Sequence, residues 1–198
     1  MAQFLDAVKN RRSIYKLGPI SGLMVDKVEN VIKTAIKHAP SAFNSQSSRV
    51  VFLYGAHKER FFDILEEKLK AITGPEGFVK TKAKLDGFRG GVGAALFYED
   101  QSVIKGLQEK FPGYAKMFPL WAEQGHGIAA ALAWIALSDF GLGATLQHYN
   151  PLIDEQIAAE WKIPDNWVLT AQLIFGSKES EPGEKTFLDE AERYKSFS

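Results

Sequence analysis

The chain has 198 residues, which is long enough for one domain to bury most of its apolar surface without disulfides or metals. It contains no cysteine, so a disulfide framework, a thiolate metal site and a cysteine nucleophile are excluded, and redox chemistry would need a cofactor. The 24 basic and 24 acidic residues cancel, and no segment is a dense block of one sign. This balance argues against a nucleic-acid or anionic-membrane partner.

Two apolar segments could be mistaken for targeting or membrane signals. The N-terminal MAQFLDAVKNRRS carries acidic and amide residues and lacks the apolar centre of a signal peptide, so we expect a cytoplasmic protein. The longest apolar run, GIAAALAWIALSDFGLG at 127–143, is broken by Ser138 and Asp139 and is shorter than the roughly 20 residues that cross a bilayer. This run predicts a buried helix.

The first half of the chain predicts three helices and two strands. The first helix is short and ends near Arg11, and the second covers 24–39, where apolar residues recur with helical period. RVVFLYG at 49–55 predicts a buried strand, and a third helix from 58 should close at the Thr73-Gly74-Pro75 break. GGVGAALFYED at 90–100 predicts the second strand.

The second half begins with an irregular, partly helical segment at 102–124, broken by Pro112 and Pro119, which could form a lid or a substrate wall. The remaining expectations are a helix at 129–137, a strand or extended segment at 141–149, a helix capped by Asn150 with Pro151 in its first position, a strand at 167–176 and a polar tail. Mixed helices and strands of this kind indicate an α+β or α/β fold with a small central sheet.

Several common site motifs are missing. The four histidines, His38, His57, His126 and His148, match no paired metal-ligand spacing, so we expect no metal site. GLGATL at 141–146 has two glycines of a dinucleotide fingerprint but follows a predicted helix, so we interpret it as a helix end entering a strand. No Walker lysine motif and no GxSxG elbow occurs, so phosphoryl transfer and serine hydrolysis lack support.

One turn is unusually rich in neutral polar side chains. Within APSAFNSQSSRVVFLY at 39–54, six such residues fall in eight positions: Ser41, Asn44, Ser45, Gln46, Ser47 and Ser48. A turn needs only one or two of them to set its backbone, so the remainder must bond elsewhere. Two partners are open for these side chains. One is water, as in an ordinary exposed loop, and the other is a ligand rich in donors and acceptors, such as a phosphate, a ribityl chain or a flavin edge.

The Arg11-Arg12-Ser13 sequence follows the first predicted helix. Arginine binds phosphate with two parallel hydrogen bonds and serine adds a hydroxyl, so this tripeptide suits a phosphate or a flavin edge. Alternatively, the two cations complement the dipole at the end of the helix.

Four segments together resemble the nitroreductase family of flavin mononucleotide (FMN) enzymes. They are NRRSIYKLG at 10–18, APSAFNSQSSRVVFL at 39–53, SDFGLGATLQHYNP at 138–151 and LIFGSKESEPGEK at 173–185. The resemblance covers nearly the whole chain, and the order and spacing of four segments are more specific than any one of them. Within the family, the sequence is most similar to a subgroup that includes the copper-induced nitroreductase of lactic acid bacteria and fungal proteins linked to fatty-acid repression.

The resemblance implies a fold and an assembly. We expect one FMN-binding domain over 1–198, of mixed α+β class, with a central, mostly antiparallel sheet flanked by helices. A C-terminal arm from about 177 would extend to the partner subunit of a homodimer.

The resemblance also implies a cofactor site. Arg11, Arg12 and Ser13 would hold the phosphate and the pyrimidine side of the flavin, and the turn would contact the ribityl and phosphate region across the dimer interface. Lys185 matches the usual C-terminal phosphate-binding cation, with Lys178 as a rival, and the 146–149 backbone would lie near the reactive edge. The cofactor residues implied are Arg11, Arg12, Ser13, Ser41, Phe43, Asn44, Gln46, Leu146, Gln147, His148 and Lys185.

Two positions depart from the family pattern. His148 stands where many relatives have a glutamate near the flavin N5, which leaves the local proton chemistry open. Ser47-Ser48 stand where a proline and an aromatic residue often follow the glutamine of the turn. The aromatic candidates to stack on the ring or on a substrate are Tyr15, Phe43, Phe118 and Trp121, although each could instead be core, and for Trp121 core comes first.

The activity that the resemblance implies is reduction of nitroaromatics or quinones by NADH or NADPH in a ping-pong cycle, with a role in oxidative or metal stress defence. The flavin carries the chemistry, so we expect no essential catalytic side chain. One alternative is a flavin-binding regulatory or stress protein with little turnover, linked to lipid metabolism. Another is a cofactor-free structural dimer whose polar turn faces water.

Overall fold

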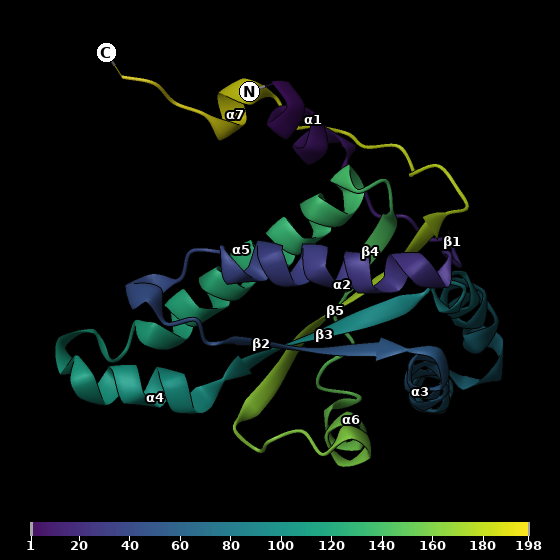
Figure 1. The fold of residues 1–198 in the computed structure, drawn as a ribbon, viewed down its shortest axis with the longest axis horizontal. Helices are drawn as coiled ribbons and strands as arrows, with labels where there is room; N and C mark the ends of the chain where they lie inside the picture. Colours follow the sequence, from purple (N-terminus) through teal and green to yellow (C-terminus); the bar gives the residue numbers. More distant parts are fainter. Residues whose placement is uncertain (1, 198) are drawn as a thin grey trace.

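A computed structural model of the chain describes residues 2–197; Met1 and Ser198, which the expected domain includes, lie outside the described residues. Its centre is a five-stranded sheet in the order β1-β5-β3-β2, with β4 also paired to β5 (Figure 1). The strands are β1 (Leu17–Gly18), β2 (Ser48–Tyr54), β3 (Gly93–Asp100), β4 (Gly143–Gln147) and β5 (Trp167–Lys178). All pairings between these strands are antiparallel, which confirms the predicted sheet.

The helices cover both faces of the sheet. They are α1 (Ala2–Asn10), α2 (Gly22–Lys37), α3 (Gly55–Arg89), α4 (Gln101–Lys110), α5 (Phe118–Asp139), α6 (Asp154–Trp161) and α7 (Glu190–Arg193), with 3-10 turns η1 (Ala42–Asn44) and η2 (Pro112–Tyr114). One apolar core joins the sheet to α3 and α6, and a second joins it to α2 and α5. The mixed α+β class and the flanking helices are therefore as predicted (Figure 1).

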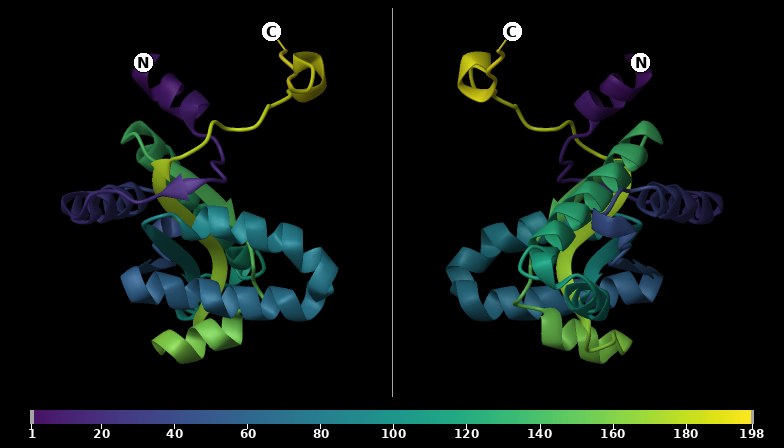
Figure 2. Two further views of the ribbon diagram at one scale, coloured as in Figure 1. Left: turned by 90° about the vertical axis from the view of Figure 1, so that its right-hand side faces the viewer. Right: turned by 90° about the vertical axis from the view of Figure 1, so that its left-hand side faces the viewer.

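Two prolines open helical stretches that lie outside the predicted helix bounds. Helix α5 starts at Phe118, well before the predicted 129, because Pro119 occupies its first turn, where a missing N–H costs nothing. In α3 the chain kinks at Gly74, as expected, but Pro75 opens a second helical half that runs to Arg89. Figure 2 shows the resulting helical hairpin.

The predicted cap at Asn150 is wrong. Turns occupy 150–153, the N–H of Leu152 donates to the Tyr149 carbonyl at 3.0 Å, and α6 begins only at Asp154. The expected helix end before β4 is correct, because Gly141 has a φ of 86° two residues after α5 ends.

Residues 179–189 follow β5 without regular structure and lead to α7, away from the sheet (Figure 2). None of the described helices has the length and apolar character needed to cross a membrane.

Candidate functional site

The polar turn has an unusual backbone. Phe43, Asn44 and Gln46 have φ values of 55°, 51° and 48°, which is the left-handed region that disfavours residues with a Cβ. Within the turn, the N–H of Gln46 donates to Ser41 Oγ at 3.0 Å, and the N–H of Asn44 donates to the Ser41 carbonyl at 2.9 Å. Ser41 is therefore an internal support of this turn.

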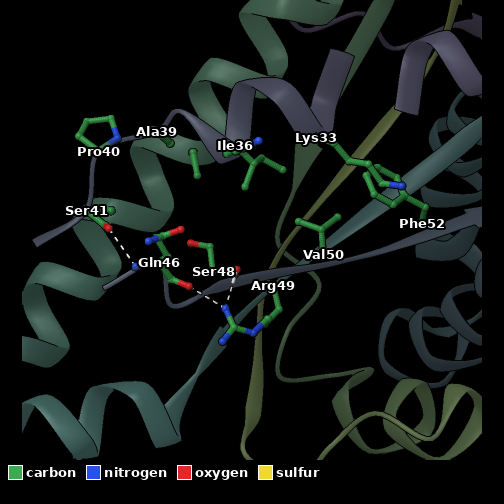
Figure 3. A pocket seen from close by; sticks show the side chains of 13 residues that line it. Lys33, Ile36, Ala39, Pro40, Ser41, Gln46, Ser48, Arg49, Val50 and Phe52 are labelled. Carbon is green, nitrogen blue, oxygen red and sulfur yellow. Dashed lines mark hydrogen bonds between the residues drawn. The ribbon is translucent and has the colours of Figure 1, made fainter. Parts of the chain in front are cut away.

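A cavity of about 370 Å³ lies beside the turn, between α2, β2 and α5 (Figure 3). Its polar lining consists of three cations and three neutral groups: Lys33, Lys37, Arg49, Ser41, Gln46 and Ser48. Lys33 is paired with Glu29 and Arg49 with Asp100, whereas Lys37 has no acidic partner among the described residues. The cavity has the charge and the hydrogen-bonding groups for an anionic or polar ligand.

The hydroxyls of the last two serines of the turn are engaged within the chain. Ser47 Oγ and Ser48 Oγ each donate to the Glu99 carboxylate, at 2.5 Å, and Glu99 is only 1% exposed. Burial raises the pKa of Glu99, while the two hydroxyls act in the opposite direction.

Arg11 and Arg12 lie just after α1, next to the start of β4. The guanidinium of Arg11 stacks over the Trp134 ring at 4.4 Å, and Arg12 donates to the Gly183 carbonyl of the tail. Among the described residues neither arginine forms an ion pair. Burial, and then the neighbouring Arg12 charge, lower the pKa of Arg11. A bound anion would relieve this repulsion.

Strand β4 presents an open edge to this basic segment. It pairs with β5 on one side, and on the other side Ser13 bridges to Ala144, whose carbonyl accepts from the Ile14 N–H at 3.0 Å. Because backbone groups alternate along a strand, the N–H of Leu146 also points away from β5. The edge therefore offers a backbone donor two residues from the Ser13 contact.

The end of β4 is fixed from within the sheet. Gln147 donates to Thr145 Oγ1 at 2.7 Å, and the N–H of Tyr149 donates to Gln172 Oε1 at 2.8 Å. His148 is exposed, and its charge, after burial, contributes to lowering the pKa of the buried His126 to about 4.

Three of the four aromatic candidates form one cluster. The Phe43 ring lies 5.3 Å from Phe118 and 6.1 Å from Trp121, between ring centroids. Phe118 is 2% exposed and belongs to a small core, whereas Phe43 is half exposed. Tyr15 is elsewhere, packed on Phe88. Phe43 is thus the accessible ring of the cluster, and Phe118 a buried one.

The two candidate phosphate cations of the tail both lie near the basic segment. Lys178 pairs in register with Leu17, and Lys185 follows two residues after Gly183, which accepts from Arg12. Their roles remain predictions.

The predicted cofactor residues form two separate groups on one chain. Ser41 packs against Gly125 and Arg11 against Trp134, and these two positions of α5 are about 14 Å apart along the helix axis. Figure 1 shows α1 beside one end of α5 and the 39–46 segment beside the other. The arginine segment and the polar turn therefore do not converge on one point within a chain.

With this geometry in place, comparison with known proteins identifies the family. A profile of the nitroreductase family matches residues 8–177. The chain belongs to the nitroreductase family. Two Saccharomyces cerevisiae proteins, HBN1 and nitroreductase FRM2, are 37% and 33% identical to it, over 95% and 94% of this chain and 94% and 93% of their own lengths.

Among solved nitroreductases, CinD from Lactococcus lactis in complex with nicotinic acid is 47% identical, with a TM-score of 0.91. The match covers 98% of this chain and 100% of the CinD chain. The nitroreductase-like fold expected from the sequence is therefore confirmed, together with the resemblance to the bacterial and fungal subgroup.

The structure of this nitroreductase adds residues that sequence reasoning missed. Glu99 and Asp100 anchor the turn, Trp134 supports Arg11, and Gly125 lies against Ser41. The sequence does carry a signal for Glu99 and Asp100, because these two adjacent acids end the apolar strand GGVGAALFYED. The Trp134 and Gly125 contacts have no such local signal.

Proposed function

We propose that this nitroreductase is an FMN-dependent oxidoreductase of the cytoplasm that uses NADH or NADPH to reduce nitroaromatics or quinones. The observation that carries the proposal is the pair Arg11 and Arg12, two guanidiniums without an acidic partner in the described residues, beside the open edge of β4. An adjacent pair of unneutralised cations with a serine hydroxyl suits a phosphate group. The family and the CinD similarity support the same conclusion.

The residues present fit FMN chemically. The phosphate would be held by Arg11, Arg12 and Ser13, with Lys178 or Lys185 as an additional cation. Trp134 adds a further sign of an incomplete site, because its indole N–H is buried without a hydrogen-bond partner beside Arg11. The outward N–H of Leu146 would donate to the flavin ring, and the Gln147 and His148 backbone would flank it.

Each site residue has a positioning task. The arginines would bind and orient the phosphate, and the β4 edge, fixed through Tyr149 and Gln172, would position the flavin ring. His148 is exposed at the end of this edge and would lie beside the ring. When bound, FMN would supply the redox chemistry between the nicotinamide nucleotide and the acceptor.

The polar turn would complete the site from a second copy of the chain. The two groups of site residues lie about 14 Å apart along α5, so a two-fold dimer could bring the turn of one chain to the arginines of the other. Phe43, Asn44 and the Ser41–Gln46 turn would then face the cofactor. Tyr15 and Trp121 would wall the substrate side, with the buried Phe118 packed behind Phe43. The tail beyond Lys178, with its exposed Phe187 and Phe197, would reach the partner as an arm.

The substrate class is supported by what CinD binds. CinD has been solved with nicotinic acid, with chloramphenicol and with 4-nitrophenol. Nicotinic acid contains the pyridine ring of a nicotinamide, and 4-nitrophenol is a nitroaromatic, so one pocket of this kind would serve the donor and the acceptor in turn. A role in stress defence is part of the proposal.

The test is an absorbance spectrum of the purified protein incubated with FMN and freed of excess, followed by anaerobic addition of NADH or NADPH. We expect flavin bands that bleach with the nucleotide and return on addition of 4-nitrophenol or a quinone. Flavin bands that the nucleotide does not bleach would instead indicate a flavin-binding regulatory protein. No flavin uptake at all would contradict the proposal.

A paired substitution tests the phosphate contacts. Arg11→Ala should raise the FMN dissociation constant by about 10- to 100-fold, because charge-assisted hydrogen bonds are lost. Arg60→Ala, which removes a guanidinium paired with Glu160 away from the site, is the control and should leave FMN affinity unchanged. Equal affinities of both variants, measured by flavin fluorescence, would exclude Arg11 from the site.

A further inference from the structure

We propose that Glu99 and Asp100 are positioning residues that clamp the polar turn in its ligand-binding conformation, Glu99 through Ser47 and Ser48 and Asp100 through Arg49. The inference rests on the proposed function, since it assigns the turn to cofactor binding. It gives a role to the two hydroxyls at the end of the turn, which both donate to Glu99.

The first half of the clamp is a buried carboxylate with neutral donors. Both Glu99 oxygens are engaged, Oε2 by the Ser47 hydroxyl and Oε1 by the Ser48 hydroxyl, and no cation pairs with Glu99 in the described part of the chain. A carboxylate 1% exposed must be hydrogen-bonded, so it holds its two donors firmly. The register of β2 and β3, which pairs Ser48 with Glu99, makes this contact.

The second half is an arginine bridge to the turn backbone. Arg49 Nη2 pairs with Asp100 Oδ2 at 2.9 Å, while Nη1 donates to the Gln46 carbonyl at 2.7 Å and to the Ser48 carbonyl at 3.1 Å (Figure 3). Asp100 is itself fixed, because its Oδ1 accepts from Ser102 and from Asn166 at 2.6 Å. The backbone N–H of Asp100 also donates to the Ser47 carbonyl at 3.0 Å.

The turn needs such a clamp because its backbone is strained. Three of its residues, Phe43, Asn44 and Gln46, have left-handed φ values although none is glycine. Residues in this region persist only where their surroundings hold them, and such strain is concentrated at functional sites. The clamp engages 46–49, directly after the strained residues, and leaves the Phe43 and Asn44 side chains exposed.

Glu99 does not line the cavity beside the turn, so its effect must pass through the serines. The experiment therefore compares FMN affinity, by flavin fluorescence, with the hydrogen exchange of the 42–49 amides without FMN. Glu99→Ala should raise the FMN dissociation constant by about 10-fold and speed exchange across the turn. Glu99→Gln should stay within about threefold of the native protein, because an amide can accept from one serine and donate to the other.

A matched control separates positioning from general loss of stability. Asp154→Ala removes another carboxylate whose pKa burial raises, on α6 and away from the turn. It should change neither FMN affinity nor turn exchange. The double substitution Ser47→Ala with Ser48→Ala should reproduce the Glu99→Ala effects, and adding Glu99→Ala to it should cause no further loss of FMN affinity, since the three residues act as one unit.

The outcomes are distinct for the two proposals. If the native protein takes up no FMN, the proposed function fails, while hydrogen exchange still tests the clamp. If native FMN binding is intact but Glu99→Ala and the double serine variant bind FMN and exchange like native protein, the clamp is refuted. If Glu99→Ala does not fold, the double serine variant decides by the same two measurements.

Discussion

Two buried ionisable side chains, Glu99 beside the polar turn and His126 on α5, have neutral hydrogen-bond partners. Glu99 accepts from two serines, and His126 Nδ1 lies 3.3 Å from Thr170 Oγ1 with its ring edge-on to Phe97. Neutral partners keep such groups in place without an ion pair, but they do not stabilise a charge on a buried imidazole. The protonation of His126 should therefore oppose folding.

His126 should make the protein less stable in mild acid. Burial, then the His148 charge, lower its pKa from 6.5 to about 4, so the unfolded chain binds a proton more readily than the folded one. The folded state has its full stability with respect to His126 above pH 6.5, where the imidazole is neutral in both states. This contribution is lost as the pH falls toward 4. In full it amounts to about 3 kcal/mol.

Urea unfolding of the native protein and of His126→Gln at pH 7 and pH 4 measures this effect. The free-energy difference between native protein and variant should shrink by about 3 kcal/mol on going to pH 4. All carboxylates are common to both proteins and cancel in this difference. His38→Gln, at an exposed histidine, should leave the pH dependence as it is; a His126→Gln protein with the native pH dependence would contradict the assignment.

At the scale of elements, the kink of α3 depends on one glycine. Gly74 has a φ of 68° and a ψ of 173°, a combination that only glycine adopts readily, and no atom would clash with a Cβ there. Gly74→Ala should therefore lower the free energy of unfolding by about 1–3 kcal/mol, through the backbone alone. Chemical denaturation measures the change.

Gly77→Ala is the matched control in the same helical hairpin. This glycine is exposed, has helical neighbours, and a Cβ there would meet only Thr73 Cβ at 3.5 Å. Alanine should raise the unfolding free energy by roughly 0.5–1 kcal/mol, because it favours the helix. If Gly74→Ala and Gly77→Ala change the free energy of unfolding in the same direction, the kink of α3 does not depend on Gly74.

Local periodicity predicted the four longer strands and the cores of most helices, because those signals lie within a few consecutive residues. It misplaced the starts of α5 and α6 and missed the second half of α3, since a proline that opens a helix and one that ends it look alike without the surrounding packing. Motifs pointed to candidate site residues such as Arg11, and their role in cofactor binding stays a prediction. Glu99 was missed because its contact with Ser48 depends on strand register, which is set by long-range pairing.

At the scale of the molecule, α5 is apolar on more faces than one chain covers. Ala130, Ala133 and Leu137 pack in the core against α2 and the sheet, while Leu120 and Ile128 remain exposed on the same helix. Phe4 of α1 is exposed beside Leu132 in an adjacent groove. A helix with apolar residues all round is normally buried, so the proposed second copy would cover this surface.

Substitution at Ile128 tests that assembly. Ile128 is 40% exposed and lines a cavity with Phe43 and Trp121, next to the polar turn. An aspartate placed there would carry an unpaired charge into the interface, so Ile128→Asp should shift the protein from dimer to monomer in sedimentation velocity and lower its FMN content. Val79→Asp, at an apolar residue 69% exposed on α3, should remain a dimer with FMN bound. A dimeric, FMN-loaded Ile128→Asp protein would show that the surface of α5 around Ile128 is not where the two copies meet.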